Sequence, residues 1–156
     1  MTAGDTIAAQ LTVADLMSEP VQVTHRDDSV AAAIAQMQRH GVRSLIVDRL
    51  NHTLPYGIVT ERDIVYRVFA RGLDPQRVRV QDIMRQPCIA VDPTLSFQAA
   101  AQLFSETGIQ RAPVLDGETL LGILSVTDLV MKLPCPPGLA PTERATHDAL
   151  LTPTQG

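Results

Sequence analysis

The sequence contains one short segment twice, and this repeat constrains the fold more than any other feature. Residues 57–63 are Gly-Ile-Val-Thr-Glu-Arg-Asp, and residues 122–128 are Gly-Ile-Leu-Ser-Val-Thr-Asp. A second matched pair, Val-Ala-Asp-Leu-Met at 13–17 and Val-Gln-Asp-Ile-Met at 80–84, is offset by 67 positions. This period exceeds the roughly 20–50 residues of stacked solenoid repeats. The sequence therefore predicts two copies of a small mixed unit, packed about a pseudo-twofold axis.

In the first copy, apolar residues at helical spacing predict a helix over 30–40 that ends at Gly41. Short apolar runs predict buried strands over 44–48 and 56–59. A second helix is predicted from Thr60 to Gly72. Its buried residues are expected to be Ile64, Val65, Val68 and Phe69.

The second copy repeats this order after a strand predicted over 88–91. A helix is expected to end at Gly108, followed by strands over 111–115 and 120–124 and a helix over 125–133. The first copy carries about two extra loop residues within 49–55, because the offset falls to 65 between Gly57 and Gly122. We therefore divide the chain into an N-terminal extension (1–10), a first repeat (11–73), a second repeat (74–133) and a Pro-rich tail expected to be flexible (134–156).

Composition argues against several classes of partner. The net charge is −4, aromatic residues make up 3% of the chain, and tryptophan is absent. Nucleic-acid-binding surfaces need a basic excess or stacking aromatic side chains, so we expect no nucleic acid partner. No run of 18 apolar residues predicts a membrane span, and residues 1–11 do not resemble a secretory signal. Two cysteines are too few for a disulfide framework, so a reducing cytoplasm is the expected location.

Each repeat closes with a hydroxyl residue three positions before an aspartate, in Thr60-x-x-Asp63 and Ser125-x-x-Asp128. One interpretation is a capping box, which satisfies backbone N–H groups at a helix start. The other is ligand binding, because a helix N-terminus attracts phosphate and a carboxylate accepts hydrogen bonds from ribose hydroxyls. The glycine that opens each motif would let a flat base approach the backbone. Two matches in register, each after an apolar strand, favour the ligand interpretation.

These residues together resemble a tandem pair of cystathionine-β-synthase (CBS) domains. The resemblance covers about residues 11–133. It rests on the matched segments 13–17 and 80–84, on segments 41–48 and 108–116, and on the two closing motifs. It implies an α+β fold of two β-α-β-β-α repeats packed through their sheets as a Bateman module. Such a module regulates a partner enzyme or transporter by binding AMP, ADP, ATP or S-adenosylmethionine between its repeats, and it often forms a homodimer.

The resemblance also implies roles for single residues. Asp63 and Asp128 would hold ribose hydroxyls, and Thr60 and Ser125 would contact phosphate or ribose.

Arg62 and Thr127 would point toward the same phosphate, and Arg111 matches a basic residue that meets phosphate across the cleft. Adenine would lie near Val21 and Cys88. In the first copy, the position of Arg111 is taken by Ser44, and Arg43 lies one residue away, which on a strand is the other face. The two sites are therefore expected to differ in affinity or charge preference.

No pattern predicts catalysis or a metal site. Nucleophile–base pairs and Gly-rich phosphate loops are absent from the sequence, and the four histidines are scattered without ligand spacing. Cys88 is interpreted as a small buried hydrophobe rather than a nucleophile. The alternative to a sensor is a ligand-free interaction scaffold, with Cys135 of the tail available to link a partner by redox chemistry.

Overall fold

The first lobe of the molecule is built on helix α3 (Val30–His40). The Ser29 side chain accepts a hydrogen bond from the Ala32 N–H at 3.0 Å, and Gly41 ends the helix in the left-handed conformation, with φ 63°. The helix packs on a three-stranded sheet of order β1-β2-β3. Strand β1 (Val23–Thr24) runs parallel to β2 (Ser44–Val47), which pairs antiparallel with β3 (Gly57–Thr60). The computed structural model describes residues 10–134.

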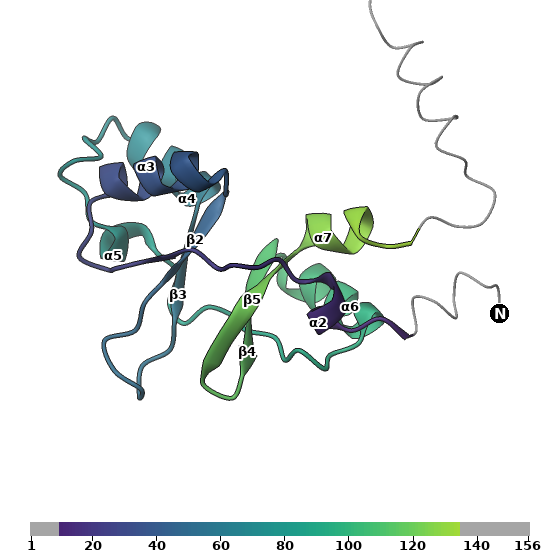
Figure 1. Ribbon diagram of the computed structural model, residues 1–156. Helices are drawn as coiled ribbons and strands as arrows, with labels where there is room; N and C mark the ends of the chain where they lie inside the picture. Colours follow the sequence, from purple (N-terminus) through teal and green to yellow (C-terminus); the bar gives the residue numbers. More distant parts are fainter. Residues whose placement is uncertain (1–9, 135–156) are drawn as a thin grey trace, which may run out of the picture.

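The second lobe repeats this plan. Helix α6 (Phe97–Thr107) is capped by Ser96 and ends at Gly108, which has φ 73°. It covers an antiparallel pair of strands, β4 (Arg111–Asp116) and β5 (Thr119–Ser125), and helix α7 (Val126–Met131) follows. In Figure 1 the strands of both lobes lie at the centre of the molecule, with α3, α4, α6 and α7 outside them. The predicted α+β fold of two repeats is confirmed.

Two predicted elements differ from the structure. The segment 88–91 is not a strand, since only Val91 forms a bridge, parallel to Val114 of β4. The helix after Thr60 forms as α4 (Glu61–Ile64) and continues as a π-helix, η1 (Val65–Phe69). Ile64 and Val68 fill the side that faces the core. Val65 and Phe69 therefore lie outside, 45% and 52% exposed, and the prediction that they are buried was wrong.

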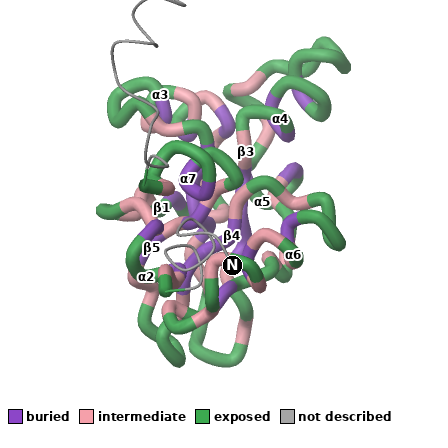
Figure 2. Tube along the Cα trace, turned by 90° about the vertical axis from the view of Figure 1, so that its right-hand side faces the viewer, coloured by how far each residue is buried: buried purple, intermediate pink, exposed green. Residues whose placement is uncertain are grey.

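The two lobes exchange residues 13–18 and 80–85, which we call the leaders. Helix α2 (Val13–Leu16) precedes the first repeat but packs in the core of the second, whereas α5 (Val80–Ile83) packs in the core of the first. Figure 1 shows α5 beside α3 and α2 beside α6. The branched apolar residues of the two helices are at most 3% exposed: Val13, Leu16, Val80 and Ile83. Each core is therefore completed by chain from the other side of the molecule, and the purple segments of Figure 2 mark these cores.

The exchange requires a close approach at Gly57 and Gly122. After α5, Arg85 pairs with Ile58 through two backbone hydrogen bonds of 2.9 and 3.0 Å. A Cβ atom on Gly57 would lie 3.1 Å from both the Met84 sulfur and the Arg85 carbonyl oxygen. At Gly122 a Cβ atom would meet the equivalent leader, residues 17–18, at 2.8 and 2.9 Å. The space that we expected a flat base to use is thus filled by the chain itself.

None of the helices within residues 10–134 has both the length and the apolar character needed to cross a bilayer.

Truncation of a leader is expected to loosen the opposite lobe. Leu16→Ala removes a side chain that is 1% exposed in the second core, and large-to-small core changes of this kind cost about 2–5 kcal/mol. Urea denaturation should show this loss, and hydrogen exchange should speed up in α6 and β4 more than in α3. Leu50→Ala, at a residue 64% exposed, is the matched control and should change stability little. Faster exchange confined to α3 and β2 would contradict the exchanged packing.

Candidate functional site

A cavity of about 80 Å³ lies where the end of β3 meets the segment before β4. We call it the first crevice. It brings together Thr60 and Arg62 from the first repeat with Arg111 from the second, three of the residues for which the sequence analysis expects ligand contacts. Its lining is completed by Ile58, Glu61, Arg85, Gly108, Ile109 and Gln110.

Asp63 lies behind this lining and is 2% exposed. Its Oδ2 accepts hydrogen bonds from the backbone N–H and the hydroxyl of Thr60, both at 3.0 Å. The Asp63 N–H donates in return to Thr60 Oγ1 at 3.2 Å. The capping box considered from the sequence is therefore formed, and this oxygen of the carboxylate faces its own backbone.

The other carboxylate oxygen of Asp63 faces the exchanged leader. Its Oδ1 lies 3.5 Å from Arg85 Nε, and Arg85 also lines the first crevice. A buried carboxylate needs such a cation, because an unpaired charge in a protein interior costs several kcal/mol. Sequence reasoning missed Arg85. Two features of the sequence could have indicated Arg85. It directly follows Met84 of the repeated segment 80–84, and Gly57 offers a position without a side chain on which that segment can pack.

The second repeat holds its aspartate in the same way with different partners. Asp128 is 8% exposed, and its Oδ2 accepts a hydrogen bond from the Ser125 N–H at 2.9 Å. Its Oδ1 accepts from the Ser18 hydroxyl at 3.1 Å and lies 3.3 Å from Lys132 Nζ. Lys132 also donates to the carbonyl oxygens of Leu16 and Met17. A leader thus contacts the closing aspartate in both halves of the molecule.

A third aspartate shows what capping alone requires. Asp15 accepts hydrogen bonds from the backbone N–H and the hydroxyl of Thr12 at 2.9 and 3.1 Å, as Asp63 does from Thr60. Asp15 is nevertheless exposed to solvent. A capping box therefore does not require burial. Asp63 and Asp128 are buried in addition to capping a helix, and each also contacts a leader.

The remaining predicted residues are distributed over both lobes. Thr127 is exposed at the start of α7, and Val21 is half-buried just before β1. Ser44 is 7% exposed, and Arg43 lines the groove between α3 and α4 of its own lobe. Within residues 10–134, no three His, Cys, Asp or Glu side chains are grouped so that they could hold a metal ion. Cys135 lies outside the described residues.

Cys88 is held by the first repeat. Its sulfur donates a hydrogen bond to the Tyr56 carbonyl oxygen at 3.2 Å, and its side chain is half-buried. Burial disfavours the thiolate and raises the pKa of Cys88 to about 11. This supports the interpretation of Cys88 as a small apolar side chain.

Comparison with known proteins gives the family of the chain. The family model described as CBS domain matches residues 13–70 and again residues 80–134. The solved hexameric CBS-CP12 protein from bloom-forming cyanobacteria is 41% identical, with a TM-score of 0.78, over 90% of this chain and 83% of that one. The uncharacterized protein MK0525 of Methanopyrus kandleri is 34% identical over 72% of this chain, which spans 58% of its length. The tandem pair of CBS domains is thus confirmed.

A more distant structure shares the fold. The CBS domain pair of protein MJ0100, solved in complex with 5′-methylthioadenosine and S-adenosyl-L-methionine, is 22% identical with a TM-score of 0.67. The alignment covers 78% of this chain and 94% of that one.

The raised pKa predicts a poorly reactive thiol at Cys88. At pH 8 a thiol of pKa about 11 is ionised in about one molecule per thousand, whereas free cysteine, with a pKa near 8.5, is about one quarter ionised. At pH 8, alkylation of Cys88 by iodoacetamide, followed by mass spectrometry of its peptide, should be about 200-fold slower than that of free cysteine. The rate should increase up to about pH 11. Labelling as fast as that of free cysteine would contradict the burial of the thiol.

Proposed function

Because this chain belongs to the CBS domain family, we propose that it is a regulatory module that binds an adenosine compound in the first crevice. The observation that carries this proposal is that both repeats line the first crevice, beside the buried carboxylate of Asp63. Arg85 contacts Asp63 from the exchanged leader, and Arg111 reaches the same crevice from the second repeat. The ligands solved with MJ0100 are adenosine compounds, although its low identity makes the likeness one of fold.

The chemistry of the lining suits the parts of such a ligand. The Asp63 carboxylate would accept hydrogen bonds from the vicinal hydroxyls of ribose, as carboxylates do in other nucleotide sites. The guanidinium groups of Arg62 and Arg111 would donate to phosphate, and guanidinium–phosphate pairs are among the stronger hydrogen bonds in proteins. The Thr60 hydroxyl would join them by turning its proton from Asp63 Oδ2 to the phosphate. The related residues Ser125, Thr127 and Asp128 would form the second site. Adenine would lie toward Val21 in one half and toward Cys88 in the other.

Binding would require the first crevice to open. Ligand pockets usually measure about 300–1,000 Å³, and the cavity here measures about 80 Å³. Ribose would displace Arg85 from Oδ1 of Asp63, freeing its guanidinium for phosphate. Because the backbone of Arg85 is paired with Ile58 in the other repeat, this change would alter how the repeats meet. A partner enzyme or transporter would then sense the shift between two arrangements of the repeats. The ligand causes this shift by binding one arrangement more tightly than the other.

A ligand-free interaction scaffold is the second candidate. It is favoured by the hydrogen bonds that Asp63 and Asp128 already make without a ligand. A thermal-shift screen separates the two candidates, because a ligand at 100 times its dissociation constant adds about 2.7 kcal/mol of stability. No shift with AMP, ADP, ATP or S-adenosylmethionine would favour the scaffold.

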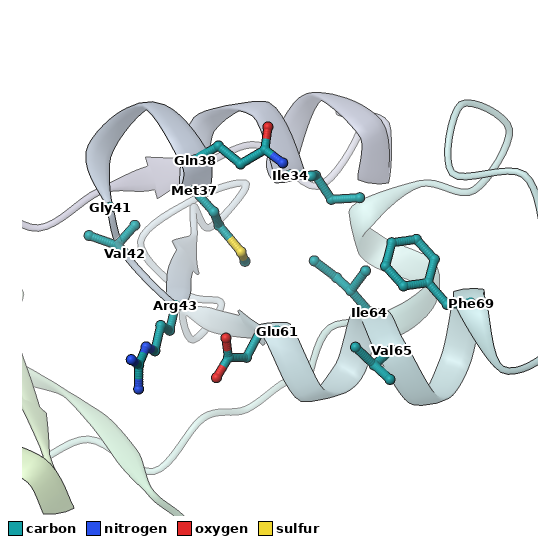
Figure 3. Close-up of a pocket in the computed structure, with 10 residues that line it drawn as sticks. All are labelled: Ile34, Met37, Gln38, Gly41, Val42, Arg43, Glu61, Ile64, Val65 and Phe69. Atoms are coloured by element: carbon teal, nitrogen blue, oxygen red, sulfur yellow. The ribbon is translucent and has the colours of Figure 1, made fainter. Parts of the chain in front are cut away.

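We also propose that the module forms a homodimer through its helix faces. Figure 3 shows Met37 and Ile34 of α3 opposite Ile64 and Phe69, around a groove of about 360 Å³. The second repeat carries a corresponding groove of about 550 Å³ between α6 and α7. Val65 and Phe69 are exposed at the first face, and Val126 and Val130 at the second. Covering such exposed apolar side chains with a second copy lowers the free energy.

Replacement of the buried carboxylate tests the binding site. Asp63→Ala should weaken adenine-nucleotide binding at least 10-fold in calorimetry, because it removes the acceptor for the ribose hydroxyls. Loss of the cap alone should cost about 0.5–2 kcal/mol of stability. Asp15→Ala is the matched control, because it removes the same cap at an exposed site. Equal affinity in Asp63→Ala and the wild type would count against the site.

Charge at the helix faces tests the dimer. Phe69→Glu and Val130→Glu, at residues 52% and 74% exposed, should shift the protein toward monomer in sedimentation velocity experiments, because a buried unpaired carboxylate opposes association. Leu50→Glu places the same charge on a loop outside both grooves and should leave the association state unchanged. A dimer that persists in both helix-face variants would exclude these surfaces as the interface.

A further inference from the structure

The second half lacks the three arginines of the first crevice. We infer that the first crevice is selective for phosphorylated adenosine compounds, while the equivalent region of the second half is not. This inference rests on the proposed function and adds to it the class of ligand and the number of ligands per chain.

The pseudo-twofold relation assigns an equivalent in the second half to every residue of the first crevice. Ser18 pairs with Ile123 through two backbone hydrogen bonds, as Arg85 pairs with Ile58. The side chains follow the backbone, because Ser18 contacts Oδ1 of Asp128 while Arg85 contacts Oδ1 of Asp63. Leader residues 18 and 85 are therefore equivalent in position and in contact.

The same relation holds for the other two arginines of the first crevice. Arg111 opposes Ser125 in the β4–β5 pair, as Ser44 opposes Thr60 in the β2–β3 pair. Arg62 directly precedes the first closing aspartate, and Thr127 directly precedes the second. All three arginines of the first crevice are thus replaced by hydroxyl residues in the second half: Arg62 by Thr127, Arg85 by Ser18 and Arg111 by Ser44.

The charge of the first crevice therefore differs from the charge at the equivalent positions of the second half. The first crevice is lined by three arginines and one glutamate, Glu61. In the second half, Val126 replaces Glu61, and Arg43 replaces Gln110 as the single cation at the equivalent lining positions. Arg43 lines the groove between α3 and α4 beside Glu61, as Figure 3 shows. Lys132 is the nearby cation of the second half, and it is engaged with Asp128 and two carbonyl oxygens.

The guanidinium groups of the first crevice are positioned from three different elements. Arg85 comes from the leader, and Arg111 from the start of β4. Arg62 comes from α4, where it lies over the Tyr66 ring at 5.2 Å from the centroid. Three planar donors around one small cavity suit the oxygens of a phosphate group and repel a sulfonium cation. The first crevice is therefore expected to bind one phosphorylated adenosine compound per chain. It is not expected to favour adenosine or S-adenosylmethionine.

The experiment replaces the three arginines of the first crevice by residues of the kind found at the equivalent positions of the second half. The triple variant Arg62→Thr, Arg85→Ser, Arg111→Ser carries the residues that the second half already accommodates. Calorimetry with AMP, ATP, adenosine and S-adenosylmethionine should give about one phosphorylated ligand per wild-type chain. In the triple variant, affinity for AMP and ATP should fall at least about 10-fold, since each charge-assisted hydrogen bond contributes about 10-fold or more. Adenosine affinity should change less than about threefold.

Two further variants keep the result interpretable. Arg71→Ser removes one exposed positive charge outside the crevice and should leave all affinities unchanged. Arg111→Ser alone keeps the Arg85–Asp63 contact, so it reports on phosphate selectivity even if the triple variant melts at a lower temperature. Two phosphorylated ligands bound equally per chain, or equal losses for adenosine and AMP, would overturn this inference alone. No binding of any of the four compounds to the wild type would overturn the proposed function as well.

Discussion

The close approach of Met84 and Arg85 to Gly57, repeated by Met17 and Ser18 at Gly122, holds the two repeats together. Each leader crosses to the other lobe, buries its helix in that core, and pairs with the residue after the glycine. A methyl group at either glycine would meet backbone oxygen at about the van der Waals limit or closer. Because each core needs the leader of the other repeat, the lobes cannot separate without exposing apolar surface in both.

This exchange also builds the candidate site. The leader that fills the first core continues directly to Arg85, whose guanidinium meets the buried Asp63. The capping box fixes one carboxylate oxygen toward Thr60, so the other is presented to the boundary between the repeats. Packing, helix capping and the electrostatics of the crevice therefore share the same few residues. A ligand that competes for Asp63 would act on the contact that joins the lobes, which is how a small molecule could bias their arrangement.

Much of this could be predicted from the sequence, because the repeat is visible in local patterns. Gly41 and Gly108 mark helix ends, and the two closing motifs mark strand-to-helix junctions, all of which depend on neighbouring residues alone. The exchange of leaders is a long-range property, and no local pattern distinguishes packing on one's own repeat from packing on the other. For that reason the sequence did not indicate Arg85. Gly57 and Gly122 were expected to let a flat base approach, whereas the chain itself packs against them. Because the side chains of Val65 and Phe69 are apolar, we expected them to be buried. Apolar side chains can also form an exposed helix face, as these two do.

Hydrogen–deuterium exchange measured with and without a saturating concentration of AMP tests the central claim, that a ligand acts through the contact between a leader and a closing aspartate. The account predicts that slowed exchange will include residues 58–63 and 85 together with 108–111, because these segments line the first crevice. Protection should be weaker at the equivalent positions of the second half, which are residues 123–128, 18 and 41–44. Protection limited to one repeat, or no change in either, would contradict the account.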